Sequence, residues 1–134
     1  MRFMIIVKAT PDSEAGVMPS ESLMAAMAAY HQELAQAGVL LDANGLQPSA
    51  KGWRIRYAGK RRDVVDGPFA ETKELVAGYT LIQVRSREEA MEWTRRFPAP
   101  FEGIACEIEV RQLFELGCSP FASSSTPALA SSWW

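Results

Sequence analysis

Residues 2–8 read Arg-Phe-Met-Ile-Ile-Val-Lys, and this short run is the strongest indication of the fold. Successive side chains of a strand point to opposite faces, so Phe3 and Ile5 share one face. Met4 and Ile6 occupy the other face, which is equally apolar. A strand that is apolar on both faces is typical of the middle of a sheet covered from both sides. The run therefore predicts a central strand with packing partners above and below it.

Two helices are predicted from caps and apolar spacing. Ser20 is a suitable N-cap for a helix that continues to about Ala37 and carries one apolar stripe. That stripe consists of Leu23, Met27, Tyr30 and Leu34. Ser86 and Glu89 have the spacing of a capping box, and Pro98 ends the helix that follows. The inward side chains of this second helix are Ala90, Trp93 and Phe97.

The order of elements predicts an α+β fold. Extended segments are expected at 39–45, 53–57, 61–65, 78–85 and 106–114, with a tight turn at Gly59. Together with the first strand and the two helices, this is a ferredoxin-like split βαβ pattern with one added hairpin. We interpret Tyr30, Trp53, Tyr57 and Trp93 as core residues.

The sheet has more apolar surface than two helices can cover. Both helices fit on one face, yet strands 2–8 and 78–85 are apolar on both faces. A second copy of the chain, stacked sheet on sheet about a two-fold axis, is the simplest cover. The pattern therefore predicts a homodimer.

Composition narrows the class of protein. The chain has 134 residues and a net charge of −2, with 14 basic and 16 acidic residues, so it lacks the basic excess of a nucleic-acid-binding domain. Lys60 to Arg62 have Asp63 and Asp66 beside them, which indicates a solvated hairpin tip. Two cysteines and one histidine do not predict a metal site. With no apolar run of membrane-spanning length, we expect a cytoplasmic protein and no membrane contact.

The chain divides into two parts. Residues 1–116 are predicted to form one domain, which is an ordinary size. Residues 117–134 carry no charge and are rich in serine and proline, which predicts a disordered tail.

One polar segment, residues 65–74, has the composition of a functional loop. Asp66 can cap a turn, Gly67 permits an unusual backbone angle, and Pro68 fixes a corner. Phe69 anchors the loop in apolar surroundings. The following ionisable side chains, Glu71, Lys73 and Glu74, are then presented from a rigid scaffold, where function is common.

This segment resembles the signature of the DGPF, or YCII-related, proteins. The match starts at Asp66-Gly67-Pro68-Phe69 and continues through Glu74, with further similarity at 38–40, 45–49 and 107–111. It covers about residues 2–115. The resemblance implies a dimeric α+β-barrel fold in small bacterial proteins, many without an assigned role. Some members are encoded near extracytoplasmic-function sigma factors.

Related YCII proteins are proposed to use a His–Asp pair for acid–base chemistry. The resemblance assigns that pair to His31 and Asp66, and His31 is matched by its place on the first helix. A histidine titrates near neutral pH and suits proton transfer. The same resemblance makes Gly67, Pro68, Phe69, Glu71 and Lys73 candidate ligand contacts. No cofactor and no metal are expected.

The same residues also fit purely structural roles. His31 also suits a boundary position where it completes a hydrogen bond, and Asp66 to Pro68 also suit a purely structural turn. Charged side chains such as Lys73 are most often solvated. Two functions therefore remain open. One is a cofactor-free lyase or isomerase acting on a small molecule. The other is a non-catalytic ligand-binding or regulatory dimer linked to sigma-factor stress signalling.

Overall fold

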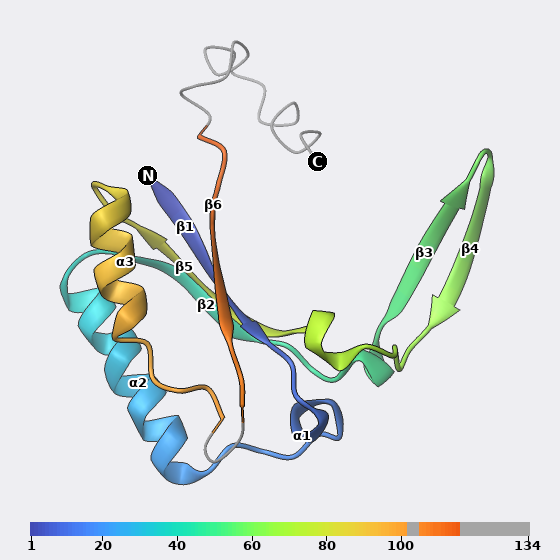
Figure 1. Cartoon of the computed structure of the whole chain (residues 1–134), viewed down its shortest axis with the longest axis horizontal. Helices are drawn as coiled ribbons and strands as arrows, with labels where there is room; N and C mark the ends of the chain where they lie inside the picture. Colours follow the sequence, from blue (N-terminus) through green and yellow to red (C-terminus); the bar gives the residue numbers. More distant parts are fainter. Residues whose placement is uncertain (102–104, 116–134) are drawn as a thin grey trace.

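The computed structural model describes residues 1–101 and 105–115, which form an α+β fold around a four-stranded antiparallel sheet (Figure 1). Its strand order is β2-β5-β1-β6. The strands are β1 Arg2–Lys8, β2 Leu40–Gly45, β5 Val76–Gln83 and β6 Ile108–Gln112. β5 and β1 occupy the centre, so the two segments that are apolar on both faces are indeed the inner strands. The order and the antiparallel pairing confirm the split βαβ arrangement.

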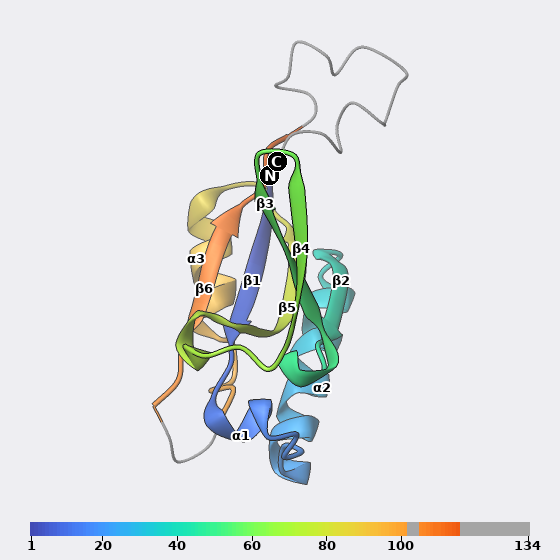
Figure 2. The same ribbon diagram turned by 90° about the vertical axis from the view of Figure 1, so that its right-hand side faces the viewer.

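Two helices lie on one face of this sheet (Figures 1 and 2). The longer is α2 Glu21–Gln36, whose N-cap Ser20 accepts a hydrogen bond from the Leu23 amide. It ends before Gly38, whose φ of 76° is the left-handed conformation that glycine favours at a helix end. The other is α3 Arg87–Arg95. Both predicted helices are therefore confirmed.

The cap of α3 differs in one detail from the expected capping box. The Ser86 hydroxyl accepts from the Glu89 amide at 3.1 Å, as predicted. The Glu89 carboxylate accepts from the Arg85 amide at 2.9 Å, one residue before the N-cap. Two backbone amides are thus satisfied at this helix end, as in a capping box, but the second is the Arg85 amide, which lies outside the helix.

The core lies between the helices and the sheet. Its most buried side chains are Ile5 on β1, Leu34 on α2 and Ile82 on β5, each with no exposed surface. Tyr30 belongs to the same cluster, and its hydroxyl donates to the Trp93 carbonyl oxygen at 2.7 Å, which links α2 to α3. Burial raises the pKa of Tyr30 to about 12. The core roles of Tyr30 and Trp93 are confirmed.

The opposite face of the sheet, which we call the open face, is apolar at its centre. Its central residues are Met4, Ile6, Tyr79 and Leu81, paired across β1 and β5. All four are half-buried, and neither α2 nor α3 packs on them. At the β2 edge the Tyr79 hydroxyl donates to Asp42 at 2.8 Å and accepts from Asn44 at 3.0 Å. At the β6 edge Glu109 pairs with Lys8 and Arg111.

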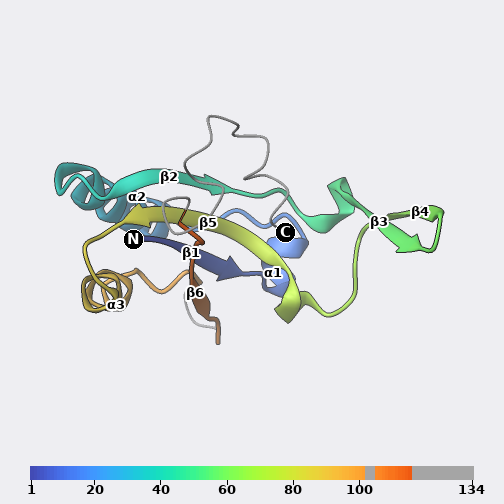
Figure 3. The same ribbon diagram turned by 90° about the horizontal axis from the view of Figure 1, so that it is seen from above.

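Strands β3 Trp53–Ala58 and β4 Arg61–Asp66 form a separate two-stranded sheet, which we call the arm. The arm projects from the body on the side of the open face (Figures 1 and 3). Trp53 and Tyr57 are 64% and 68% exposed, so the prediction that they are core residues is wrong. The alternating pattern identified a strand correctly, but the hairpin packs against no helix of the described chain.

The described residues also include three short helical turns: α1 Pro11–Glu14, η1 Ser49–Lys51 and η2 Thr72–Glu74. The boundary near residue 116 and the predicted tail at 117–134 lie outside the described residues. Within the described part, every helix is too short or too polar to cross a bilayer.

Candidate functional site

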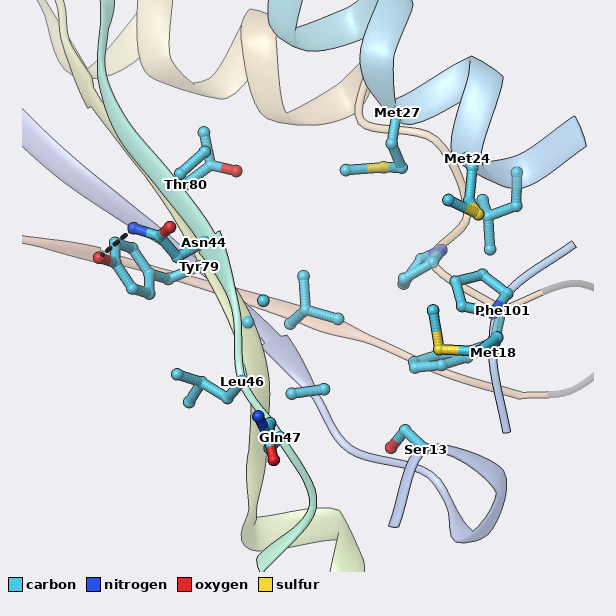
Figure 4. Close-up of a pocket in the computed structure, with 18 of the residues that line it drawn as sticks. Ser13, Met18, Met24, Met27, Asn44, Leu46, Gln47, Tyr79, Thr80 and Phe101 are labelled. Atoms are coloured by element: carbon cyan, nitrogen blue, oxygen red, sulfur yellow. Dashed lines mark hydrogen bonds between the residues drawn. The ribbon is translucent and has the colours of Figure 1, made fainter. Parts of the chain in front are cut away.

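A cavity of about 680 Å³ opens beside α2, between that helix, the α1–α2 segment and the ends of β2 and β5 (Figure 4). Its wall is mostly apolar. The main contributors are Val17, Met18, Met24, Met27, Leu46, Phe97 and Phe101. Methionine side chains are flexible and polarisable, so they adapt to irregular apolar ligands. The polar side chains on the wall include Ser13, His31 and Thr80.

His31 and Thr80 form the polar pair of this cavity. His31 follows the buried Tyr30 on α2, and Thr80 lies on the helix-facing side of β5, between core residues. The His31 Nε2 atom is 2.8 Å from the Thr80 Oγ1 atom. Thr80 is only 2% exposed, so its hydroxyl is fixed by the sheet. The contact therefore holds the imidazole ring in one orientation at the cavity wall.

Electrostatics favour the neutral form of this ring. Burial lowers the pKa of His31 below its ordinary value of 6.5, because desolvation penalises the charged imidazolium. A neutral imidazole has one nitrogen that accepts a proton and one that donates. Nε2 is engaged with Thr80, and Nδ1 makes no hydrogen bond within residues 1–101 and 105–115. Nδ1 is thus the ring atom left for a ligand.

The loop that follows β4 has a structural role that the sequence did not specify. The Gly67 amide donates to the Gly52 carbonyl oxygen at 3.0 Å. A Cβ atom on Gly67 would overlap the Ser49 carbonyl oxygen, so only glycine fits there. Gly67 is therefore required for close backbone approach, whereas the sequence suggested a special backbone angle. The peptide bond between Gly67 and Pro68 is cis.

Ser49 connects this loop to α1. Its hydroxyl donates to the Glu14 carboxylate in a short hydrogen bond and accepts from the Phe69 amide at 3.1 Å. The Ser49 amide also donates to Glu14 at 3.0 Å. Phe69 packs under the Arg54 guanidinium, with 3.8 Å between the guanidinium carbon and the ring centre. These contacts fasten the base of the arm to the body of the protein.

The remaining predicted loop residues lie near the arm base. Glu71 has a φ of 61°, a left-handed conformation that is costly for a residue other than glycine. A hydrogen bond with Glu71, and the negative charge of Glu71, raise the pKa of Glu74. Lys73 is exposed. Both carboxylates are exposed to solvent.

The structure separates the two residues of the predicted acid–base pair. His31 lines the cavity, whereas Asp66 ends β4 and pairs with Trp53 across the arm. Among the described residues, neither Asp66 nor the candidate contacts Gly67, Pro68, Phe69, Glu71 and Lys73 line this cavity. The nearest polar partner that the protomer supplies to His31 is Thr80.

Sequence reasoning missed Thr80 and the methionine wall. Thr80 was visible as a polar residue on the same strand face as Ile82 and Val84, where a lone hydroxyl in a core needs a partner. Met18 and Met24 gave no signal, because an exposed methionine on a loop or helix flank is unremarkable in a sequence. Within the described residues, no cluster of three or more His, Cys, Asp or Glu side chains is arranged to hold a metal ion.

Comparison with known proteins gives one family and two individual similarities. The model of the YCII-related domain matches residues 1–114. An uncharacterised protein from Rhizobium meliloti (strain 1021) is 35% identical over 75 residues, which is 56% of this chain and 60% of that relative. The match thus spans less than two thirds of the relative's length.

Among solved structures, the chain is similar to 5-chloro-2-hydroxyhydroquinone dehydrochlorinase (TftG) from Burkholderia phenoliruptrix AC1100, in complex with 2,5-dihydroxybenzoquinone. The superposition covers 85% of this chain and 94% of that one, with 16% identity and a TM-score of 0.48.

Proposed function

The chain belongs to the YCII-related domain family, and on that premise we propose that it binds a small, largely apolar molecule beside α2 and moves a proton on it through His31. The observation that carries this proposal is the 2.8 Å contact between His31 and Thr80 at the wall of an apolar cavity. A volume of about 680 Å³ lies within the range of small-molecule sites, which are mostly apolar with a few placed polar groups.

The acid–base step follows from the state of the imidazole. A ring whose pKa is lowered by burial is neutral at pH 7 and is ready to accept a proton. With Nε2 donating its hydrogen to Thr80, Nδ1 takes the proton from an acidic C–H or O–H of the ligand. The imidazolium then returns that proton to another atom of the same ligand. Return of the proton to another carbon completes an isomerisation of an enolisable or aromatic molecule. Delivery of the proton to a group that departs from the neighbouring carbon, as a C=C double bond forms, completes a lyase elimination, and neither route uses a cofactor.

Asp66 enters this scheme as the orienter or acid that the family resemblance implies. Because Asp66 lies outside the cavity lining of its own protomer, this role requires a second copy to bring it there. The loop residues Gly67, Pro68, Phe69, Glu71 and Lys73 stay predicted ligand contacts under the same condition.

The open face supports a homodimer of the dimeric α+β-barrel type. Four half-buried apolar side chains at its centre are flanked by Asp42 on one edge and Glu109 on the other. An apolar centre with a polar rim is the usual anatomy of a protein interface. We expect sedimentation velocity to show a dimer and Leu81→Glu to dissociate it, whereas a wild-type monomer at micromolar concentration would contradict the arrangement.

The same cavity also supports a second function, in which a regulatory dimer binds the ligand and transfers no proton.

Thermal-shift screening of small aromatic and enolisable compounds identifies a ligand for both functions. The ligand is then incubated with the protein in D₂O, and deuterium incorporation is followed by NMR. We expect exchange with the wild type and its loss in His31→Gln. Ligand binding without exchange supports the regulatory function, and exchange that survives His31→Gln refutes the role of His31.

A further inference from the structure

We propose that the arm, residues 53–66, clasps a second copy of this chain and buries its own apolar face against that copy. The proposal extends the homodimer proposed above and rests on it, but it is independent of the cavity and of His31. The arm is also where the structure differs most from the sequence-based prediction, because two aromatic residues predicted to lie in the core are exposed there.

One face of the arm carries four apolar side chains, flanked by Arg62 and Asp66, that its own protomer leaves largely exposed. Cross-strand pairing places Ile55 opposite Val64, with Trp53 and Tyr57 on the same side. Trp53, Tyr57 and Val64 are each about two-thirds exposed, and Ile55 is 43% exposed. An aromatic side chain buries roughly 150–250 Å² when covered, so Trp53 and Tyr57 alone offer on the order of 200–300 Å² to a partner. Such a contact is a substantial addition to a standard interface of roughly 800 Å² per partner.

A two-stranded hairpin that stands alone is marginally stable in water. The arm nevertheless has a fixed root, because Gly67 lies against Ser49, and Ser49 holds both Glu14 and Phe69. It projects on the open-face side of the sheet, which is where the proposed second copy packs (Figures 1 and 3). A preorganised element that points toward the partner loses little further entropy when it docks.

Charge distribution favours a second copy as the occupant. The arm carries five basic residues, Arg54, Arg56, Lys60, Arg61 and Arg62, against two acidic ones, Asp63 and Asp66. Residues 9–50, by contrast, contain five acidic residues and no lysine or arginine. Of these acidic residues, Asp42 lies at the β2 edge of the open face. Glu109 lies at the β6 edge of the same face. A basic arm that docks on the open face of a second copy meets the carboxylates at the edges of that face, and a two-fold axis repeats the contact in both directions.

The test compares matched variants of the full-length chain. Trp53→Ser/Tyr57→Ser removes the aromatic contacts of the arm. Met91→Ser removes an exposed apolar side chain from α3, outside the proposed interface. Leu81→Glu reports on the open face itself. Dimer dissociation constants are measured by sedimentation velocity, and circular dichroism checks that the core stays folded. We expect at least a tenfold weaker dimer for the arm variant and no change for Met91→Ser.

A second measurement does not depend on any variant. Hydrogen exchange of the wild-type arm amides is followed at protein concentrations above and below the dimer dissociation constant. We expect slower exchange in the dimer. If Leu81→Glu dissociates the dimer while the arm variant keeps wild-type affinity, the proposed contact between the arm and the second copy is refuted. The dimer through the open face is then supported. A monomeric wild type refutes both. Binding of a 20-base-pair DNA duplex is measured for the wild type and the arm variant. If the arm variant loses DNA binding but keeps the wild-type dimer affinity, the arm binds nucleic acid and the proposal is overturned.

Discussion

Replacing Gly67 with alanine tests how the loop after β4 fastens the arm. The new Cβ atom would overlap the carbonyl oxygen of Ser49, a backbone atom that cannot rotate away. Forcing extra atoms into a packed site typically costs about 1–3 kcal/mol. For a domain of this size, a loss of about 1 kcal/mol lowers Tm by roughly 4 °C, so we expect Gly67→Ala to melt about 4–12 °C below the wild type.

Gly52→Ala is the matched control, because its Cβ atom would meet the same Ser49 oxygen at an ordinary 3.7 Å. Gly52 has an extended backbone, so alanine fits without strain and stabilises by roughly 0.4–1 kcal/mol through the unfolded chain. Differential scanning calorimetry measures both variants. Hydrogen exchange then asks whether the Phe69 amide, which donates to Ser49, loses protection only in Gly67→Ala. Equal melting temperatures together with unchanged Phe69 protection would refute the steric account.

Three further predictions concern the cavity and the arm root. Burial lowers the pKa of His31, so on acidification the unfolded chain takes up this proton first, and stability falls as the pH drops below about 6.5. Urea denaturation between pH 5 and 7.5 should show a smaller loss for His31→Gln; an identical pH profile would contradict the lowered pKa. Thr80→Val keeps the buried shape but removes the hydroxyl bound to His31, and should cost about 1 kcal/mol in urea unfolding while reducing deuterium exchange on a bound ligand. Full exchange activity in Thr80→Val would show that the hydroxyl does not orient the ring. Ser49→Ala leaves the Phe69 amide and Glu14 without their partner and should cost about 1–3 kcal/mol by thermal denaturation; a neutral result would mean that water replaces the hydroxyl.

Much of the fold was readable from local signals. Ser20 and Gly38 bounded α2 correctly, because caps and left-handed stops are properties of a few neighbouring residues. The two inner strands were identified by their two apolar faces. The prediction that Trp53 and Tyr57 lie in the core was wrong, because alternating apolar and polar residues specify a strand but not what that strand packs against. Whether an apolar face is covered depends on distant chain segments or on a second molecule.

The site was less predictable for a similar reason. The family resemblance pointed to His31, and the structure places this residue at the wall of the cavity, while its catalytic role stays a prediction. Its hydrogen bond to Thr80 spans 49 residues and depends on how α2 crosses the sheet, which no local pattern encodes. The reason for Gly67 was also hidden, since the atom it must avoid belongs to Ser49, 18 positions earlier.

The two faces of β5 divide the molecule's tasks by residue parity. Even-numbered Thr80 and Ile82 point toward the helices, where they meet His31 and the core, while odd-numbered Tyr79 and Leu81 point to the open face. Substitutions at Ile82 and Leu81 are therefore expected to act on different faces, the core and the open face, whereas Tyr79 also lines the cavity and belongs to both. A single inserted residue in this strand would exchange the two sets and abolish both at once.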